Sequence, residues 1–206
     1  MIHAGDLVFD VGACLGKKAR QYLKTGARVV CFEPNPDLAR ALAGQLSGPV
    51  RVIQTALGST EGTITLWIAD TPTLSTCTEE WMTGRFARHK WTHSIVVPVT
   101  TLDRARFLYG EPDFVKIDVE GFEYDVLKGM RTPVKALSFE FAREFIHQTR
   151  LCVDYLGRLG YRLFGYAQGK ADRVTHWLDA DALLSELEVL PELAWGDVYV
   201  FMEGGQ

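Results

Sequence analysis

The sequence predicts an α/β fold in which helices cover both faces of a doubly wound, mostly parallel sheet. Along the 206 residues, short apolar runs rich in β-branched residues alternate with segments of helical periodicity, as is typical of such sheets. Runs such as Leu7-Val8-Phe9 and Phe114-Val115 lack polar alternation, which is expected of strands buried on both faces. The length fits a single domain over residues 1–206, and 47% hydrophobic and 23% charged residues are typical of globular proteins.

The predicted strands and helices follow one another in a regular order. Parallel strands are predicted at Leu7–Val11, Arg28–Glu33, Val50–Gln54, Asp113–Asp118, Ala136–Glu140 and Tyr161–Tyr166. Helices are predicted at Lys17–Thr25, Asp37–Leu46, Glu123–Lys128, Arg143–Arg158 and Asp179–Leu187. Pro36 stands near the start of the second helix, where a proline fits the first turn. Right-handed crossovers then connect the strands into one sheet.

Three segments do not follow this alternation. Gly62–Ile68 is predicted as an extra strand, and Asp70–Val99 as a long irregular insertion. Because a loop of that length inside a compact domain is usually functional, we expect residues of about 70–99 to form a lid over the substrate. The last apolar run, Asp197–Phe201, is predicted as a strand that returns to the edge of the sheet.

Charge, hydropathy and cysteine spacing exclude several classes of protein. The formal charge of −4 gives no electrostatic attraction to nucleic acid, and no apolar run approaches the roughly 18 residues that cross a membrane. The N-terminus shows no secretory signal, and the four cysteines, Cys14, Cys31, Cys77 and Cys152, form no C-x-x-C pair. We therefore expect a cytoplasmic protein with reduced thiols that acts on a small molecule, with no nucleic acid or membrane as partner.

The turn after the first strand has the features of a nucleotide-binding site. Gly12 and Gly16 follow Asp10, and glycines at this turn let the backbone pass close to a ligand. Glu33 ends the second strand, close to the roughly 20-residue offset of the acid that binds a ribose in such folds. A carboxylate at that position accepts hydrogen bonds from both ribose hydroxyls.

The same geometry occurs in dinucleotide-dependent oxidoreductases, so the two cofactor classes need to be separated. The G-x-G-x-x-G pattern is absent, because only Gly12 and Gly16 remain of it. Asp10 lies two residues before the first glycine, where it would attract an ammonium or sulfonium group and repel a pyrophosphate. The turn thus favours S-adenosylmethionine over NAD. In the alternative interpretation, Asp10 ties the turn together and the glycines serve packing.

A second group of charges follows the strand at Asp113–Asp118. Lys116, Asp118 and, if the strand continues, Glu120 point to one side, and such charges on a buried strand are costly unless they are paired or functional. Glu140 ends the next strand at the same edge, which is where open α/β sheets bind ligands. We expect Lys116 to pair with Glu140 or Glu120, and Glu123 to complement a helix dipole.

Several segments, in this order, resemble the FkbM-type methyltransferases. They are V-F-D-V-G-A-C-L-G, C-F-E-P-N-P, Q-T-A-L-G-S-T-E-G-T-I-T-L, V-T-T-L-D and, most specific, F-V-K-I-D-V-E-G-F-E-Y-D-V-L-K-G. The resemblance implies a seven-stranded, Rossmann-like class I methyltransferase fold with S-adenosylmethionine as cofactor. It also implies methylation of a hydroxyl on a sugar, natural product or other small molecule.

The resemblance assigns roles to individual positions. It places Asp10, Gly12, Ala13 and Gly16 around the methionine part of the cofactor, Glu33 at the ribose, Asn35 and Ala56 beside the adenine, and Asp118 at the transferred methyl. This chain has Cys14 where the family commonly has asparagine. It also has only six residues before its first strand, so we expect a pocket that is open or is completed by a second copy in a homodimer.

The insertion and its surroundings contain further candidates. Trp81 and Trp91 are candidates either for stacking on a substrate ring or for anchoring the lid to the core. His89 and His93 have the spacing of a metal-binding pair, but no third ligand is near in the sequence, so no metal site is predicted. His147 is a candidate for the pocket or for a solvated helix face.

The predicted reaction is in-line transfer of a methyl group from the sulfonium to a substrate oxygen. A hydroxyl acceptor loses its proton as the new bond forms, and a carboxylate serves as the base when burial raises its pKa. Asp118 is the first candidate for this base, followed by Glu120 and Glu140. Two other functions stay open at this point, namely an NAD-dependent oxidoreductase and a non-catalytic cofactor-binding or scaffold domain.

Overall fold

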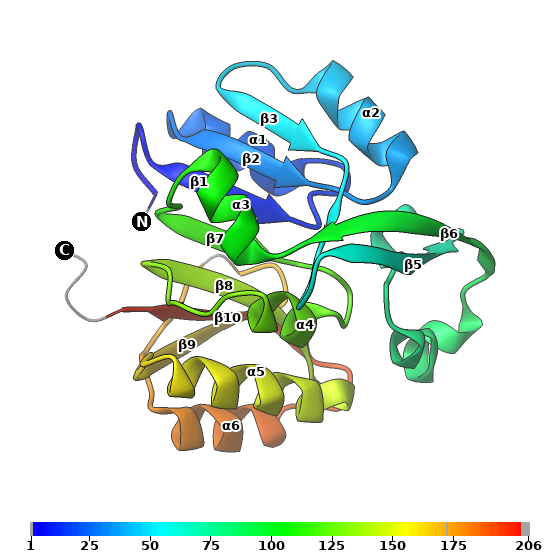
Figure 1. Ribbon diagram of the computed structural model, residues 1–206. Coiled ribbons are helices and arrows are strands. Elements are labelled where there is room, and N and C mark those ends of the chain that lie inside the picture. The colour runs from blue at the N-terminus through cyan, green and yellow to red at the C-terminus, as the bar shows by residue number, and fades with distance from the viewer. Residues whose placement is uncertain (1, 172, 203–206) are drawn as a thin grey trace.

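The computed structural model describes residues 2–171 and 173–202, and its largest element is a twisted seven-stranded sheet (Figure 1). The strand order is β3-β2-β1-β7-β8-β10-β9, and all neighbours are parallel except those of β10. The strands are β1 (Leu7–Val11), β2 (Arg28–Phe32), β3 (Val50–Ile53), β7 (Phe114–Ile117), β8 (Ala136–Ala142), β9 (Leu163–Gln168) and β10 (Trp195–Phe201). The predicted fold class, a doubly wound and mostly parallel sheet, is confirmed.

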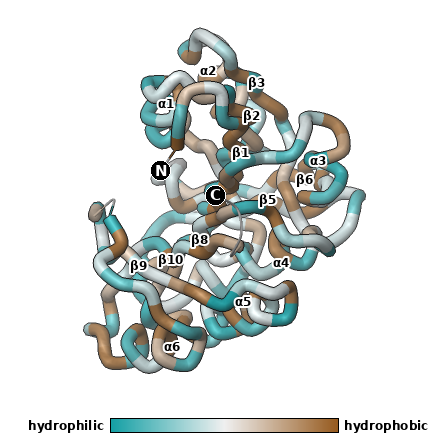
Figure 2. The backbone as a smooth tube through the Cα atoms, turned by 90° about the vertical axis from the view of Figure 1, so that its left-hand side faces the viewer, coloured by the Kyte–Doolittle hydropathy of each residue, from teal (hydrophilic) through white to brown (hydrophobic). Residues whose placement is uncertain are grey.

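Helices cover both faces of this sheet. The first two pack on the side of β2 that presents Val29 and Cys31, and the others pack on the side that presents Val30 and Phe32. They are α1 (Lys17–Lys24), α2 (Pro36–Gln45), α3 (Leu102–Tyr109), α4 (Glu123–Lys128), α5 (Ile146–Arg158) and α6 (Ala180–Glu188). In Figure 2, α5 and α6 carry both hydrophobic and hydrophilic residues, as expected of helices with one buried face.

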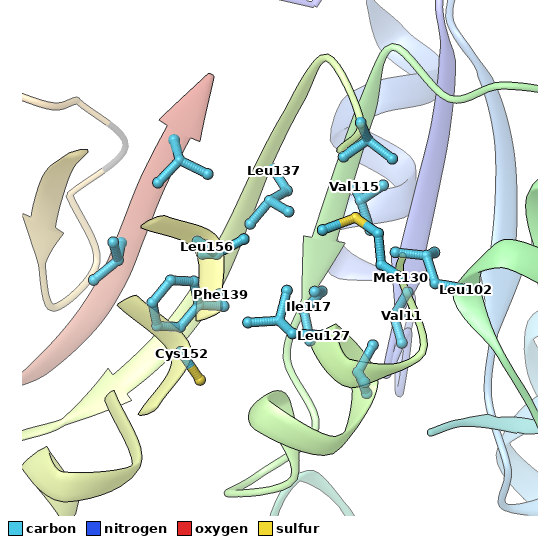
Figure 3. Packing of buried hydrophobic residues seen from close by; sticks show 14 of the residues in the cluster. Val11, Leu102, Val115, Ile117, Leu127, Met130, Leu137, Phe139, Cys152 and Leu156 are labelled. Carbon is cyan, nitrogen blue, oxygen red and sulfur yellow. The ribbon is translucent and has the colours of Figure 1, made fainter. Parts of the chain in front are cut away.

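The main hydrophobic core lies between the central strands and α3, α4 and α5 (Figure 3). Ile117 from β7 and Phe139 from β8 are fully buried there, against Leu127 and Cys152 from the helices. Side chains of this size contribute roughly 1.5–3 kcal/mol each when they are fully buried. The core thus holds β7 and β8 rigidly side by side, and the candidate site lies at the ends of these strands.

The position of the last strand differs from the prediction. The sequence predicts that it returns to the edge of the sheet, but β10 lies between β8 and β9 and runs antiparallel to both. Consequently β9, which is predicted among the parallel strands, forms the edge and pairs with β10 alone in the described part of the sheet. The insertion of β10 brings Asp197 into register with Glu140.

The segment predicted as an irregular insertion is partly regular. A second sheet of order β4-β6-β5 consists of β4 (Ala56–Leu57), β5 (Gly62–Ala69) and β6 (Trp91–Thr100), and it projects from the main sheet (Figure 1). The prediction was therefore wrong for residues 91–99, where polar Thr92–Ser94 and Pro98 obscure the strand pattern. Short 3-10 turns fill most of residues 72–88. Helix α3 was not predicted from the sequence and is only two turns long.

No helix in the described part of the chain is long and apolar enough to cross a bilayer. Helix starts follow local rules. The Asn35 side chain accepts hydrogen bonds from the amides of Asp37 and Leu38, which caps α2 directly before Pro36. In the same way, Thr101 caps α3 and Asp179 caps α6.

Candidate active site

A cavity of about 340 Å³ opens at the carboxyl ends of β1 and β7. Strand order reverses between these two strands, and ligands of open α/β sheets bind at such a reversal. The wall of the cavity includes the turn after β1, the end of β2, the segment after β7 and part of the insertion. Thr73, Ser75 and Cys77 come from that insertion.

The turn after β1 packs tightly against the segment that follows β7. Gly12 has φ of +80°, and a Cβ atom at this position would lie 1.8 Å from the carbonyl oxygen of Asp118. The amides of Gly12 and Ala13 both donate to the carbonyl of Phe32, at 2.9 and 3.2 Å. Only glycine fits here, because its lack of a side chain permits both the left-handed backbone and the close approach.

Glu33 connects the turn to the end of β2. Its two carboxylate oxygens accept hydrogen bonds from the amides of Cys14 at 2.7 Å and Asn35 at 2.9 Å. Burial raises the pKa of Glu33, and these two hydrogen bonds oppose the rise. Each carboxylate oxygen keeps a second lone pair, so Glu33 retains the capacity to bind hydroxyl groups of a ligand in the cavity.

Asp10 is a buried acid that lines the cavity. Only 2% of its surface is exposed, and its Oδ2 atom has no hydrogen-bond partner within the described residues. Burial raises the pKa of Asp10 to about 7, although the nearby Lys116 ammonium acts in the opposite direction. A buried carboxylate oxygen without a partner is costly, and a cationic group of a ligand would offset that cost.

Asp10→Asn should change stability and cofactor binding in opposite directions. The pKa of Asp10 is about 7 in the folded chain against an ordinary 3.8, so its contribution to stability is present below pH 4 and is lost as the pH rises through 7. Without ligand, the variant should therefore be more stable than wild type in urea unfolding at pH 8. Its affinity for S-adenosylhomocysteine, measured by calorimetry, should be lower at that pH. Equal urea stability of the two proteins at pH 8 would contradict the buried charge.

Three carboxyl groups meet beside Asp10. Oxygens of Asp118, Glu120 and Glu140 all lie within 4.8 Å of one another. Burial raises the pKa of Glu120 and of Glu140 well above the usual range, and repulsion from Asp118 adds to the rise in both. Burial and repulsion thus favour the protonated forms of Glu120 and Glu140. The spacing of the three carboxyl groups also suits the ligands of one metal ion, and no other described residues form such a group.

Lys116 balances part of this negative charge. Its ammonium lies 3.2 Å from the carboxylate of Asp118 and 2.8 Å from that of Asp197 on β10. The ion pairs predicted from the sequence were with Glu140 or Glu120. Burial acts to lower the pKa of Lys116, but the charges of Asp118, Asp197 and Glu140 outweigh it and raise the pKa well above its usual range. The expected partners were wrong because Asp197 enters the site only through the insertion of β10 into the sheet.

The turn after β7 brings Glu120 to the group. The strand ends at Ile117, so Glu120 is placed by a left-handed backbone with φ of +54° and not by strand alternation. Glu123 is buried in the first turn of α4, where one of its oxygens accepts hydrogen bonds from the amides of Val119 and Gly121. Burial raises the pKa of Glu123 to about 7. It therefore clamps this turn, a role beyond the expected interaction with the helix dipole.

The insertion packs on the same turn. The Thr76 hydroxyl donates to the carbonyl of Glu120 at 2.6 Å, and a Cβ on Gly121 would lie 2.7 Å from the ring of Trp81. Trp81 is buried, stacks on Phe86 and contacts the ring of Phe145 at a tilt, so the three rings form one cluster. Trp81 thus anchors the insertion to the turn after β7.

Most of the predicted site residues meet in the cavity. Its wall includes Asp10, Gly12, Ala13, Glu33, Ala56, Asp118, Glu120 and Glu140. Gly16 and Asn35 are not part of that wall. Gly16 precedes α1 with φ of +70°, and a Cβ there would lie 2.5 Å from Leu42 of α2, while Asn35 caps α2. These two residues shape the site by packing and capping.

The histidines do not gather at the cavity. His89 lies 3.6 Å from Asp70, and His93 lies beside Thr92 at 2.9 Å. His147 pairs with Glu80 at 2.8 Å on the outer side of the insertion. Trp91, the other tryptophan considered for stacking, packs beside the Trp81 cluster. None of these residues belongs to the cavity wall.

Several residues of the wall were not predicted from the sequence, among them Asp197 and Trp195 on β10 and Lys170 in the turn after β9. The sequence contains one signal for Asp197. This charged residue directly precedes Val198 and Val200, two apolar residues of a strand that is buried in the sheet. Trp195 carried no local signal. Its place in the cavity depends on the pairing of β10 with β8.

Comparison with known protein families shows which family this chain belongs to. The FkbM methyltransferase domain matches residues 10–163, which include the turn after β1, Glu33 and the charged segment after β7. The chain belongs to the FkbM methyltransferase family. The resemblance seen in the sequence motifs is thereby confirmed.

A curated relative in this comparison is the hexuronic acid methyltransferase AglP of Haloferax volcanii. It is 33% identical over 141 residues, which are 65% of this chain and 54% of the relative. The chain thus spans about half the length of the curated relative that it matches.

Solved structures share the fold of this FkbM-family chain at low identity. A precorrin-6y C5,15-methyltransferase from Geobacter metallireducens superposes with a TM-score of 0.50 at 9% identity, over 97% of this chain and 82% of that one. A precorrin-8w decarboxylase from Methanobacterium thermoautotrophicum gives 0.49 at 12% identity, over 96% and 82%. At 9% identity, the likeness to the Geobacter metallireducens structure concerns the fold alone.

Proposed function

We propose that this chain transfers a methyl group from S-adenosylmethionine to a hydroxyl group of a small molecule, in particular a sugar. One observation carries the proposal. The glycine turn after β1, the acid Glu33 at the end of β2 and the group of three carboxyl groups all line one cavity. Family membership and the sugar-modifying relative support the reaction and the acceptor class.

The residues of the cavity fit this cofactor. The Oδ2 atom of Asp10 is buried and without a partner, so it offers an ionic contact to a cation. Gly12, Ala13, Glu33 and Ala56 all line the cavity. Gly12 and Ala13 would lie beside the methionine part of the cofactor, Glu33 would accept hydrogen bonds from the ribose hydroxyls, and Ala56 would lie beside the adenine. When bound, S-adenosylmethionine supplies a methyl group on a positively charged sulfur. Asp118 adds a second negative charge to this region.

Asp118 is the proposed base. Among the three carboxyl groups, only Asp118 has an ion pair with Lys116, which fixes the position of its carboxylate. It accepts the hydroxyl proton as the acceptor oxygen gains the methyl group, and oxygens of Glu120 and Glu140 lie within 4.8 Å of it. The insertion packs on the turn that holds Glu120, where the Thr76 hydroxyl donates to the Glu120 carbonyl.

Binding experiments test the cofactor. S-adenosylhomocysteine should raise the melting temperature, because a ligand of the native state stabilises it by mass action, and NAD should not. An equal shift with NAD, or none with either ligand, would overturn the cofactor assignment. Formation of S-adenosylhomocysteine in the presence of a sugar acceptor separates an enzyme from a cofactor-binding scaffold.

Glu33→Gln should weaken the binding of S-adenosylhomocysteine by about 1.5–3 kcal/mol, because the charge-assisted hydrogen bonds to the ribose are lost. Glutamine keeps the volume and one oxygen acceptor for the amides of Cys14 and Asn35, so most of the turn should persist. Calorimetry gives the affinity, and urea unfolding without ligand gives the effect on the fold. Unchanged affinity would show that Glu33 serves only the turn.

A further inference from the structure

Trp195 lines the same cavity as the three carboxyl groups of Asp118, Glu120 and Glu140. It is the first residue of β10, it is 40% exposed, and it belongs to the cavity wall. Side chains alternate along a strand, so Trp195 points to the same face of the sheet as Asp197, roughly 7 Å further along. In the pairing of β10 with β8, Asp197 lies opposite Glu140 and Trp195 lies opposite Ala142. The indole is thus one step outward from the reacting groups.

Lys170 belongs to the same cavity wall as Trp195. The amide of Gly169 donates to the carbonyl of Trp195 at 2.7 Å, which ties the turn after β9 to the start of β10. Gly169 has φ of +62°, and the turn that it forms places the exposed Lys170 in the cavity wall. Lys170 forms no ion pair with any residue of the described ranges, 2–171 and 173–202.

The other tryptophans do not have this position. Trp81 is buried in its aromatic cluster, and Trp177, although 43% exposed, packs edge-on against Phe201 at 4.8 Å. Of the five tryptophans, all within the described ranges, only Trp195 lines the cavity. Within the described residues, Trp195 is thus the tryptophan that shares the cavity with the three carboxyl groups, and Lys170, Lys17 and Lys18 are the exposed or part-exposed cations of its wall.

We propose that Trp195 and Lys170 form the acceptor subsite and that it takes a sugar ring bearing a carboxylate. The apolar face of the sugar stacks on the indole, and its carboxylate pairs with Lys170. Repulsion by Asp118, Glu120 and Glu140 keeps the carboxylate away from the inner end, so a hydroxyl faces Asp118. This assignment rests on the proposed methyl transfer to a sugar and adds the charge and the orientation of the acceptor.

Calorimetry on the protein saturated with S-adenosylhomocysteine tests the subsite with two probes, methyl glucuronide and methyl glucoside. Wild type should bind the glucuronide at least about tenfold more tightly than the glucoside, because only the former pairs with Lys170. Trp195→Ala should weaken the binding of the glucuronide by about tenfold, whereas the matched control Trp177→Ala should leave it unchanged. Lys170→Glu should remove the preference for the glucuronide, and Lys90→Glu, an exposed lysine outside the cavity, should keep it.

Several results would overturn the subsite. Equal affinity of wild type for the two probes would refute the charge recognition, and unchanged glucuronide binding by Trp195→Ala would refute the stacking. Binding of neither probe to a protein that binds S-adenosylhomocysteine would refute the subsite as a whole. A failure of S-adenosylhomocysteine itself to bind would instead contradict the proposed function, so the two failures are distinguishable.

Discussion

Asp118→Asn should lower turnover by roughly 10²–10⁴-fold, the usual range for the loss of acid–base catalysis. Asparagine keeps the volume of the side chain but removes the negative charge that would accept the hydroxyl proton and face the sulfonium. The fold should persist, because Lys116 retains its ion pair with Asp197 at 2.8 Å and the backbone of residue 118 keeps its hydrogen bond to Val11.

The measurement separates rate from affinity. Single-turnover kinetics with a sugar acceptor give the rate, and calorimetry with S-adenosylhomocysteine gives the affinity, which should fall less than the rate. Asp154→Asn, on the exposed face of α5, is the matched control and should behave as wild type. Near-normal turnover of a folded Asp118→Asn protein would refute the catalytic role. A variant that does not fold would show that Asp118 is a structural partner of Lys116.

Gly12→Ala should abolish cofactor binding and destabilise the protein by about 2–5 kcal/mol. The left-handed backbone costs a residue with a side chain about 1–2 kcal/mol, and overpacking typically adds 1–3 kcal/mol. The overpacking arises because the new Cβ would meet the carbonyl of Asp118 at 1.8 Å. Relief of that contact separates the turn after β1 from the end of β7, and both segments line the cavity.

The variant Gly48→Ala is a control that separates the cost of the left-handed backbone from the cost of overpacking. Gly48 has φ of +99°, but nothing lies within 4 Å of the place that a Cβ would take. This control should therefore show the conformational cost alone and should retain the affinity for S-adenosylhomocysteine. Melting temperatures and calorimetry on both variants give the comparison. Equal destabilisation of the two variants with intact binding would contradict the close approach of Gly12 and Asp118.

Much of the site follows from local rules applied to the sequence. Asp10, Glu33 and Glu140 each lie at or next to the carboxyl end of a predicted strand, and such ends meet at one edge of a parallel sheet. The structure places all three in the same cavity wall. Glu120 was expected on the charged face only if the strand continued. It reaches the group through a left-handed turn instead, and Glu123 accepts hydrogen bonds from the amides of Val119 and Gly121 in that turn.

The sequence by itself determined the alternation of strands and helices, the glycine turn and the family motifs. These are local patterns, because hydrophobic periodicity and turn residues act within a few positions of the chain. Only the tertiary structure decided the place of β10, the ion pair between Lys116 and Asp197 and the exposure of Trp195 in the cavity. An apolar strand has similar periodicity at the edge and inside a sheet, so its neighbours are set by hydrogen bonding and burial across long sequence separations.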